Sequence, residues 1–195
     1  GFTIGTNDNY NTDDSTYVGW SWKCNGGTTE TTVNESGNNP GNSRQTNADA
    51  GFSIITYTGT GATGTIAHGL GAVPHWILFK ARSEAENDWA VYHHRNTAAP
   101  ATDFLRLNTN AATTDNANFM NDTAPTSSVF TVNDGSKVNS DGETYIAYCF
   151  SEKQGYSKFG SYIGNGNANG PYVHLGFKPA WVMVKKSTAT HSWYI

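Results

Sequence analysis

The sequence has 195 residues and a mass of 21.0 kDa, enough for one or two domains with a buried core. Only 14% of the residues are charged, and a formal net charge of −4 gives no basic surface of the kind that binds nucleic acid. No apolar run approaches the roughly 20 residues needed to cross a membrane. We therefore expect no nucleic-acid partner and no membrane insertion.

Small polar residues dominate the composition, since Asn, Thr, Gly and Ser together make up 82 residues, while 13% of the chain is aromatic. This combination favours strands and turns over helices. Short runs rich in β-branched and aromatic residues, bounded by turn residues, are predicted strands; they are 52–57, 76–80, 89–92, 104–107, 128–132 and 144–150. We predict an all-β fold built as an antiparallel β-sandwich or jelly roll.

The predicted strand 144–150 is apolar on both faces. Its odd-numbered residues from Tyr145 and its even-numbered residues from Ile146 point to opposite sides of a sheet, and none is charged. A strand of this kind is covered on both sides. We therefore expect it at the centre of the sheet.

The chain also resembles itself in two places. Residues 2–22 align without gaps with residues 130–150, and residues 155–185 align with 51–80 after a one-residue slip. We infer a repeated module of about 100 residues with partial modules at both ends. Residues 51–150 are the complete repeat, 1–23 the C-terminal part of a preceding repeat, and 155–195 the N-terminal part of a following one. The polar residues 24–50 are predicted to be a linker or long loop.

Several aromatic residues and prolines recur at aligned positions, which predicts a structural role for them in the module. They are Trp76 and Trp181, Trp89 and Trp193, and Pro74 and Pro179. Because the tryptophans lie among apolar strand residues, we interpret them as core aromatics rather than as a sugar-stacking platform. Better candidates for exposed, ligand-binding side chains stand beside Gly-rich turns: Tyr10, Tyr57, Tyr162, Asn165 and Asn167.

Titratable residues give weaker signals. The string from His68 to Pro74 is interpreted as a structural turn, because the aligned histidine, His174, is shifted by one position. His93 and His94 would point to opposite faces of a strand, so no metal site is predicted there. Glu84, Glu86 and Asp88 form a carboxylate cluster of the kind that a glycosidase uses, although the aligned segment 187–191 has no carboxylate.

No catalytic residue, cofactor or metal ligand is therefore predicted. Cys24 lies in a polar segment and Cys149 in an aromatic strand, and Ser21 is aligned with Cys149. Because the aligned segments share no bridge pattern, we expect two independent thiols rather than a disulfide.

Four strings, 51–59, 68–74, 88–93 and 145–150, resemble a domain of unassigned function that occurs, often in tandem, in bacteriophage tail-fibre-like and virion structural proteins. The resemblance implies an extracellular, non-enzymatic structural or adhesive module on a virion or tail fibre. Its partners would be copies of itself, other virion subunits or host surface glycans. One alternative is a cell-derived extracellular filament whose partial repeats exchange strands between molecules. A carbohydrate-active enzyme is the second alternative.

Overall fold

The structure is a computed structural model that describes residues 2–24, 30–84 and 87–195. Its described residues are almost entirely strand, turn and irregular chain, with one short helix, α1 (Asp8–Asn11). The strands are β1 (Thr31–Val33), β2 (Asn42–Asn47), β3 (Phe52–Thr58), β4 (Gly64–Ala67), β5 (Trp76–Ala81), β6 (Ala90–His93), β7 (Asp103–Arg106), β8 (Thr114–Asp115), β9 (Val129–Val132) and β10 (Thr144–Phe150). The predicted all-β class is confirmed.

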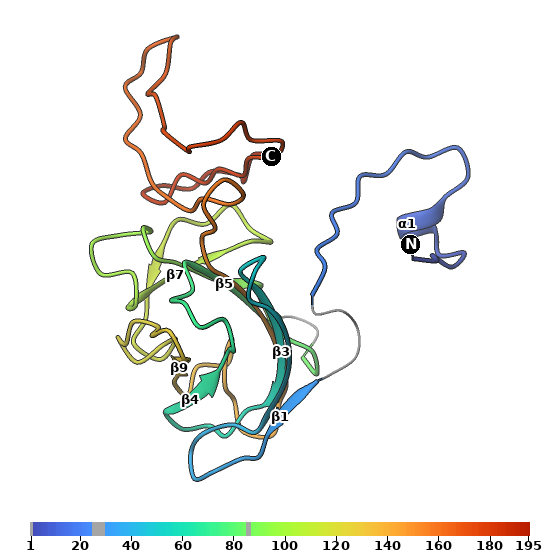
Figure 1. The fold of residues 1–195 in the computed structure, drawn as a ribbon, viewed down its shortest axis with the longest axis vertical. Helices are drawn as coiled ribbons and strands as arrows, with labels where there is room; N and C mark the ends of the chain where they lie inside the picture. The colour runs from blue at the N-terminus through green and yellow to red at the C-terminus, as the bar shows by residue number, and fades with distance from the viewer. Residues whose placement is uncertain (1, 25–29, 85–86) are drawn as a thin grey trace.

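The strands form two antiparallel sheets. The larger one has the order β1-β2-β3-β10-β5-β6-β7-β8, and β4 pairs with β9 in the smaller one. Figure 1 shows the larger sheet curving, with β4 and β9 lying on its concave side. The main hydrophobic core fills the space between the two sheets, because it combines residues of both, such as Phe79, Tyr145, Ile66 and Phe130.

Strand β10 has the central place that its two apolar faces predict. It pairs with β3 along seven residues on one side and with β5 along six on the other. Tyr145, Ala147 and Cys149 point into the core and are fully buried. The opposite face of the sheet carries a second cluster around Leu78, which includes Tyr148 of β10.

The six predicted strands are present with their ends shifted by at most one residue, whereas β1, β2, β4 and β8 were not predicted. The prediction of a linker or loop over 24–50 is wrong for 42–47, which pairs with β3 along its whole length. Strand β2 is polar although it lies between β1 and β3, because backbone hydrogen bonds to these two strands rather than buried apolar side chains hold it.

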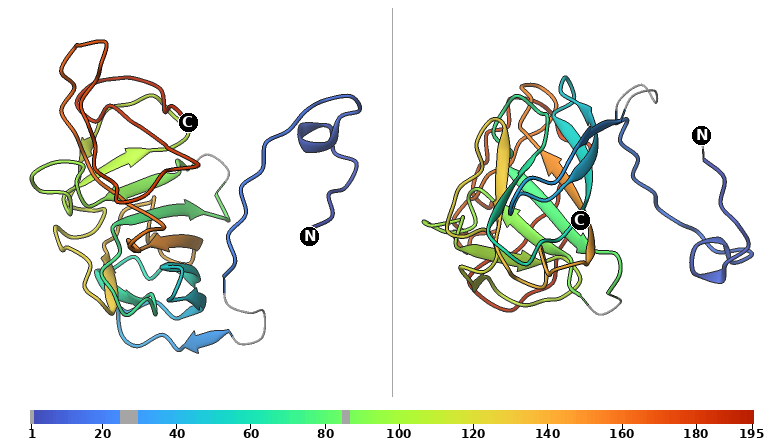
Figure 2. Two further views of the ribbon diagram at one scale, coloured as in Figure 1. Left: turned by 45° about the horizontal axis from the view of Figure 1, so that its top comes forward. Right: turned by 90° about the horizontal axis from the view of Figure 1, so that it is seen from below.

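The two terminal segments have almost no regular structure. Residues 2–22 leave the body of the molecule as an extended segment that carries α1, and residues 151–195 loop over the end of the molecule near β7 (Figures 1 and 2). Within 151–195 the only sheet pairing is two isolated bridges, Lys153 with Ser157 and Val184 with Tyr194. In the described part of the chain, no helix is long and apolar enough to span a membrane.

Candidate functional site

The densest group of titratable side chains lies where β10 continues into the C-terminal segment. His75 precedes β5, His94 follows β6, and Glu152 follows β10, and potential ligand atoms of the three lie within 4.8 Å of one another. The imidazole rings of His75 and His94 meet edge to face, with centroids 4.5 Å apart. Phe159 of the C-terminal segment stacks over the His75 ring at 6.4 Å. We call these four residues the junction cluster.

One ring nitrogen of each histidine and both carboxylate oxygens of Glu152 have partners inside the protein. His75 Nδ1 accepts a hydrogen bond from the backbone N–H of Glu152 (3.0 Å), and His94 Nε2 lies 2.9 Å from the carbonyl oxygen of Phe159. Glu152 accepts from the N–H of Phe159 through Oε1 and from Lys158 through Oε2, both at 2.9 Å. The cluster therefore fastens residues 152–159 to the sheet.

Burial favours the neutral form of two histidines, His75 in the junction cluster and His93 beside it. Burial lowers the pKa of His93 to about 4, and the neighbouring His94 acts in the same direction. Burial likewise lowers the pKa of His75, again with His94 as the next cause. For Glu152, burial acts to raise the pKa, but the hydrogen bonds from Lys158 and Phe159 outweigh it and leave the pKa below its ordinary value. At neutral pH the uncharged imidazoles of His75 and His93 thus lie close to a paired carboxylate.

Of the predicted ligand-binding residues, Tyr57 is placed wrongly by the sequence. Its side chain is only 4% exposed, it stacks on Tyr145 at 5.2 Å, and its hydroxyl donates to the carbonyl oxygen of Val138 at 2.6 Å. The Gly-rich turn that follows β3 packs against the turn before β10, so a ring beside it faces the core. The other four predicted residues, Tyr10, Tyr162, Asn165 and Asn167, are exposed and lie on the two terminal segments.

The recurring tryptophans divide into two groups. Trp76, Trp89 and Trp193 are half-buried and pack against the Leu78 cluster on the outer face of the sheet, as expected of core aromatics. Trp193 also donates from Nε1 to the carbonyl oxygen of Arg106 (2.8 Å). Trp181 is 42% exposed, so its predicted burial is wrong. The prolines differ in the same way, since Pro74 is buried and Pro179 is exposed.

The carboxylate cluster of the enzyme alternative does not form a pair across a cleft in the described residues. Asp88 Oδ2 is ion-paired to Arg106 Nε (2.8 Å) and Lys137 Nζ (2.9 Å), and its Oδ1 accepts from Asn108. Glu84 accepts a hydrogen bond from the side chain of Asn87. Glu86 lies outside the described residues. Asp88 therefore ties β7 and the 133–139 turn to the start of β6.

His68 and the two thiols are structural, as the sequence predicts. His68 is fully buried; its Nδ1 accepts from the N–H of Leu70, and its Nε2 lies 3.2 Å from the carbonyl oxygen of Thr126. Cys149 is buried and Cys24 half-buried, and they form no disulfide with each other. His68 therefore shapes the turn after β4.

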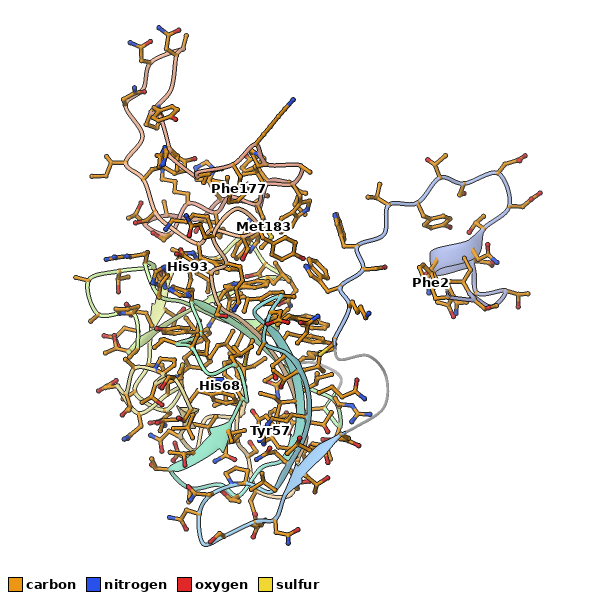
Figure 3. The ribbon with its side chains drawn as sticks, viewed as in Figure 1. Phe2, Tyr57, His68, His93, Phe177 and Met183 are labelled. Atoms are coloured by element: carbon orange, nitrogen blue, oxygen red, sulfur yellow. The ribbon has the colours of Figure 1, made fainter. Side chains whose placement is uncertain are left out.

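Exposed large hydrophobic side chains are concentrated on the terminal segments. Among the described residues, all but Val33 and Val73 of these exposed side chains lie within 2–22 or 156–195. Figure 3 shows Phe2 far from the core around Tyr57 and His68. An open hollow of about 510 Å³ lies on the C-terminal segment and is lined by residues 172–177 and Pro179. The surface best suited to a partner is thus on these segments rather than on the sheets.

The N-terminal segment has the same local backbone as the turn before β10. In residues 7–11, the N–H groups of Tyr10 and Asn11 donate to the carbonyl of Asn7 (3.2 and 2.9 Å). At the aligned positions 135–139, the N–H groups of Val138 and Asn139 donate to the carbonyl of Gly135 (3.0 and 2.9 Å). The ungapped alignment of 2–22 with 130–150 therefore has a counterpart in hydrogen bonding.

The similarity continues into the following residues. The hydroxyl of Tyr17 accepts from the N–H of Thr12 (3.0 Å), as the hydroxyl of Tyr145 accepts from the N–H of Ser140 (2.9 Å). Asp14 and its aligned residue Gly142 both have positive φ, 59° and 72°. In the C-terminal segment, Gly166 and its aligned residue Gly61 share a φ of 64°. Both terminal segments thus retain the turns of residues 51–150 without the strands.

Sequence reasoning missed the junction cluster, because its three polar side chains come from segments far apart in the chain. The signal available was the doublet of His93 and His94, which was considered alone. A family model described as a domain of unknown function, DUF7483, matches residues 1–195. No curated protein and no solved structure matches the chain.

Proposed function

The chain belongs to the DUF7483 family, and we propose that it is a non-enzymatic structural module of an extracellular assembly of the virion or tail-fibre type. In this proposal residues 51–150, with β1 and β2 added beside β3, are one repeat, and the two terminal segments are partial copies of it. The observation that carries the proposal is the separation of a closed, apolar core from terminal segments that expose their hydrophobic side chains. A module that joins to neighbours has this distribution.

The interior of the sheets supports a structural rather than a chemical role. In the described residues, buried side-chain polar atoms without a partner are limited to Asn96 Nδ2 and Ser151 Oγ. Three of the perturbed titratable groups hold elements together, His75 and Glu152 in the junction cluster and Asp88 in its ion pairs. Contacts of this kind favour a structural role for these groups.

The adhesive part of the proposal concerns host surface glycans. Four of the residues considered from sequence, Tyr10, Tyr162, Asn165 and Asn167, are exposed and combine aromatic faces with amide groups, which suits weak contacts to sugars. Weak contacts of this kind become useful when modules are linked, because avidity rises without any single strong site.

Fractionation of a culture that produces the protein tests the structural role. Extracellular particles are purified by density-gradient centrifugation, and peptides of residues 51–150 are measured by mass spectrometry in the particle, soluble extracellular and cell fractions. We expect enrichment with the particles. Recovery in the cell fraction alone would overturn the extracellular assignment.

A glycan array tests the adhesive role separately. The chain is displayed as a multimer on beads, and a Tyr162→Ala, Asn165→Ala double variant serves as the control. We expect binding to a subset of glycans that the control loses. Binding by neither protein would remove the adhesive role and leave scaffolding, and equal binding by both would exclude Tyr162 and Asn165 as the glycan site.

A further inference from the structure

We propose that residues 2–22 of one chain complete the partial unit of a second copy, residues 155–186, with 16–22 inserted as a central strand between 156–163 and 181–186. This inference rests on the repeat that the proposed function assumes, and it adds the partner, the segment and the register. It follows from what β10 does in residues 51–150, where it lies between β3 and β5.

The donated segment has the side chains that its aligned counterpart buries. Phe130, Val132, Val138 and Tyr145 are all fully buried in the core. At the aligned positions Phe2 is 77% exposed, and Ile4, Tyr10 and Tyr17 are each between 45% and 49% exposed. An amphipathic segment with its core face in solvent is stabilised when a matching surface covers that face.

The accepting segment has the residues that flank β10, but no strand between them. Its residues Tyr162, Trp181 and Lys185 align with Tyr57, Trp76 and Lys80 of β3 and β5. Strands β3 and β5 do not pair with each other, because β10 separates them. In the structure the aligned residues 156–163 and 181–186 form no ladder, and no strand of the described residues lies between them.

Gly164 is the most specific indication that a partner segment fits here. At its aligned residue Gly59, which follows β3, an added Cβ would clash with the carbonyl oxygen of Ser140 in the turn before β10. The close approach of the two turns therefore requires glycine at position 59. At Gly164 an added Cβ would meet nothing within 4 Å, and its φ is not positive. Nothing in a single chain requires glycine at this position. The carbonyl of Thr12, which aligns with that of Ser140, would require it in the proposed complex.

The exposed residues considered as ligand-binding from sequence find protein partners in the same complex, so only chains that are not assembled in this way would offer them to glycans. Asn139 accepts from the N–H of Thr60 (2.9 Å) and donates to the carbonyl of Ala62 (2.7 Å). In the proposed complex the side chain of Asn11, aligned with Asn139, would accept from the N–H of Asn165 and donate to the carbonyl of Asn167 in the second copy. In the same way, the hydroxyl of Tyr162 replaces that of Tyr57 as donor, and the carbonyl of Tyr10 replaces that of Val138 as acceptor.

The chain does not supply this complement to itself. Trp76 pairs with Phe150 across β5 and β10, so the aligned pair is Trp181 with Trp22. Within one chain, however, Trp181 contacts Trp20, two residues out of this register, at 6.5 Å. Trp22 is instead held by its own Phe52 and Phe150, at 6.2 and 5.9 Å. We therefore assign the complementary segment to a second copy.

Assembly is measured by sedimentation velocity over a concentration series of the whole chain, with two matched Gly→Ala variants. We expect the wild type to form species larger than 21.0 kDa. Gly164→Ala should weaken assembly roughly tenfold or more, because its methyl group meets the donated backbone. Gly19→Ala should assemble like the wild type, because the aligned residue of β10 is already alanine, Ala147. A wild type that stays monomeric, or equal assembly by both variants, would overturn the proposal.

Disulfide trapping tests the register and the second copy together, in a Cys24→Ser background. Ile146 pairs with Lys80, so the aligned residues are Val18 and Lys185. Chains with Val18→Cys alone, mixed with chains that carry Lys185→Cys alone, should form a mixed dimer under mild oxidation. Lys186→Cys, one residue away and on the opposite face, is the control and should form several-fold less. Crosslinking only within a chain that carries both cysteines would overturn the assignment to a second copy.

The two proposals fail in distinguishable ways. A chain that stays monomeric in these experiments yet is enriched with extracellular particles would retain its structural role without strand exchange. A chain that assembles in the predicted register but is confined to cells would retain strand exchange and lose the extracellular role.

Discussion

One sequence pattern occurs in two structural settings. It forms strands β3 and β10 with their turns, and it recurs in the aligned residues of the two terminal segments. In the first setting β10 pairs with β3 along seven residues and its core face is fully buried. In the second, the turns keep their hydrogen bonds and positive φ angles, but no ladder forms and the core face is exposed.

The comparison separates local from non-local determinants of this fold. The turns recur because Asn, Asp and Gly satisfy their own backbone within a few residues, without help from the rest of the chain. A strand gains its hydrogen bonds and its buried area only from a neighbour. The terminal segments therefore show how much of the fold the sequence specifies before strand pairing.

The largest difference in the free energy of unfolding is expected between alanine substitutions of two phenylalanines at aligned positions. Phe130→Ala should lower the free energy of unfolding by about 3–5 kcal/mol, because it leaves a cavity between the sheets. Phe2→Ala should change it by less than about 0.5 kcal/mol, because the ring is mostly in solvent. Urea unfolding of dilute, monomeric protein measures both. Equal effects would show that the N-terminal segment packs on the core.

Acidification should have the next largest effect, through His93 beside the junction cluster and His75 within it. The pKa of His93 is about 4 in the folded protein, below its ordinary value, so the unfolded chain takes up a proton first as the pH falls. Stability is fully present above about pH 6.5 and declines towards pH 4, by up to about 3 kcal/mol, and His75 contributes in the same direction.

Chemical denaturation at pH 7.5, 6.0 and 4.5 measures this decline, and His93→Gln should remove most of it. A His174→Gln variant is the control, because His174 is exposed and lies on the C-terminal segment. A pH profile of the His93 variant that matches the wild type would mean that other groups control the decline.

Gly59→Ala should have the next largest effect. It should lower the free energy of unfolding by about 1–3 kcal/mol, because the methyl group would clash with the carbonyl of Ser140. At low concentration Gly164→Ala should leave the melting temperature unchanged, since nothing lies near the added methyl group. Thermal melts by circular dichroism compare the two variants directly. A destabilised Gly164 variant would show that the C-terminal turn is already packed within the monomer.

Much of the fold could be predicted from sequence, for a physical reason that also explains the failures. Short runs of β-branched and aromatic residues locate β3, β5 and β10, because a buried strand must be apolar on its core face. Strand β2 was missed because it is held by backbone pairing with β1 and β3 and can remain polar. Trp181 was expected to be buried because its sequence neighbours resemble those of Trp76, but burial depends on a covering strand that residues 155–195 lack. Tyr57 was misplaced because the adjacent turn packs inwards.

The smallest loss of stability is expected from substitutions at two carboxylates, Asp88 and Glu84. Asp88→Asn removes the charge that pairs with Arg106 and Lys137, and should lower stability by about 1 kcal/mol because the pair is partly exposed. Glu84→Gln should change stability by less than about 0.5 kcal/mol, since among the described residues its carboxylate accepts a hydrogen bond from the nearby Asn87 side chain alone. Urea unfolding measures both variants, and polysaccharide turnover is assayed in parallel. If the wild type releases reducing sugar and either substitution abolishes that activity without loss of stability, the carboxylates are catalytic and the enzyme alternative replaces the structural one.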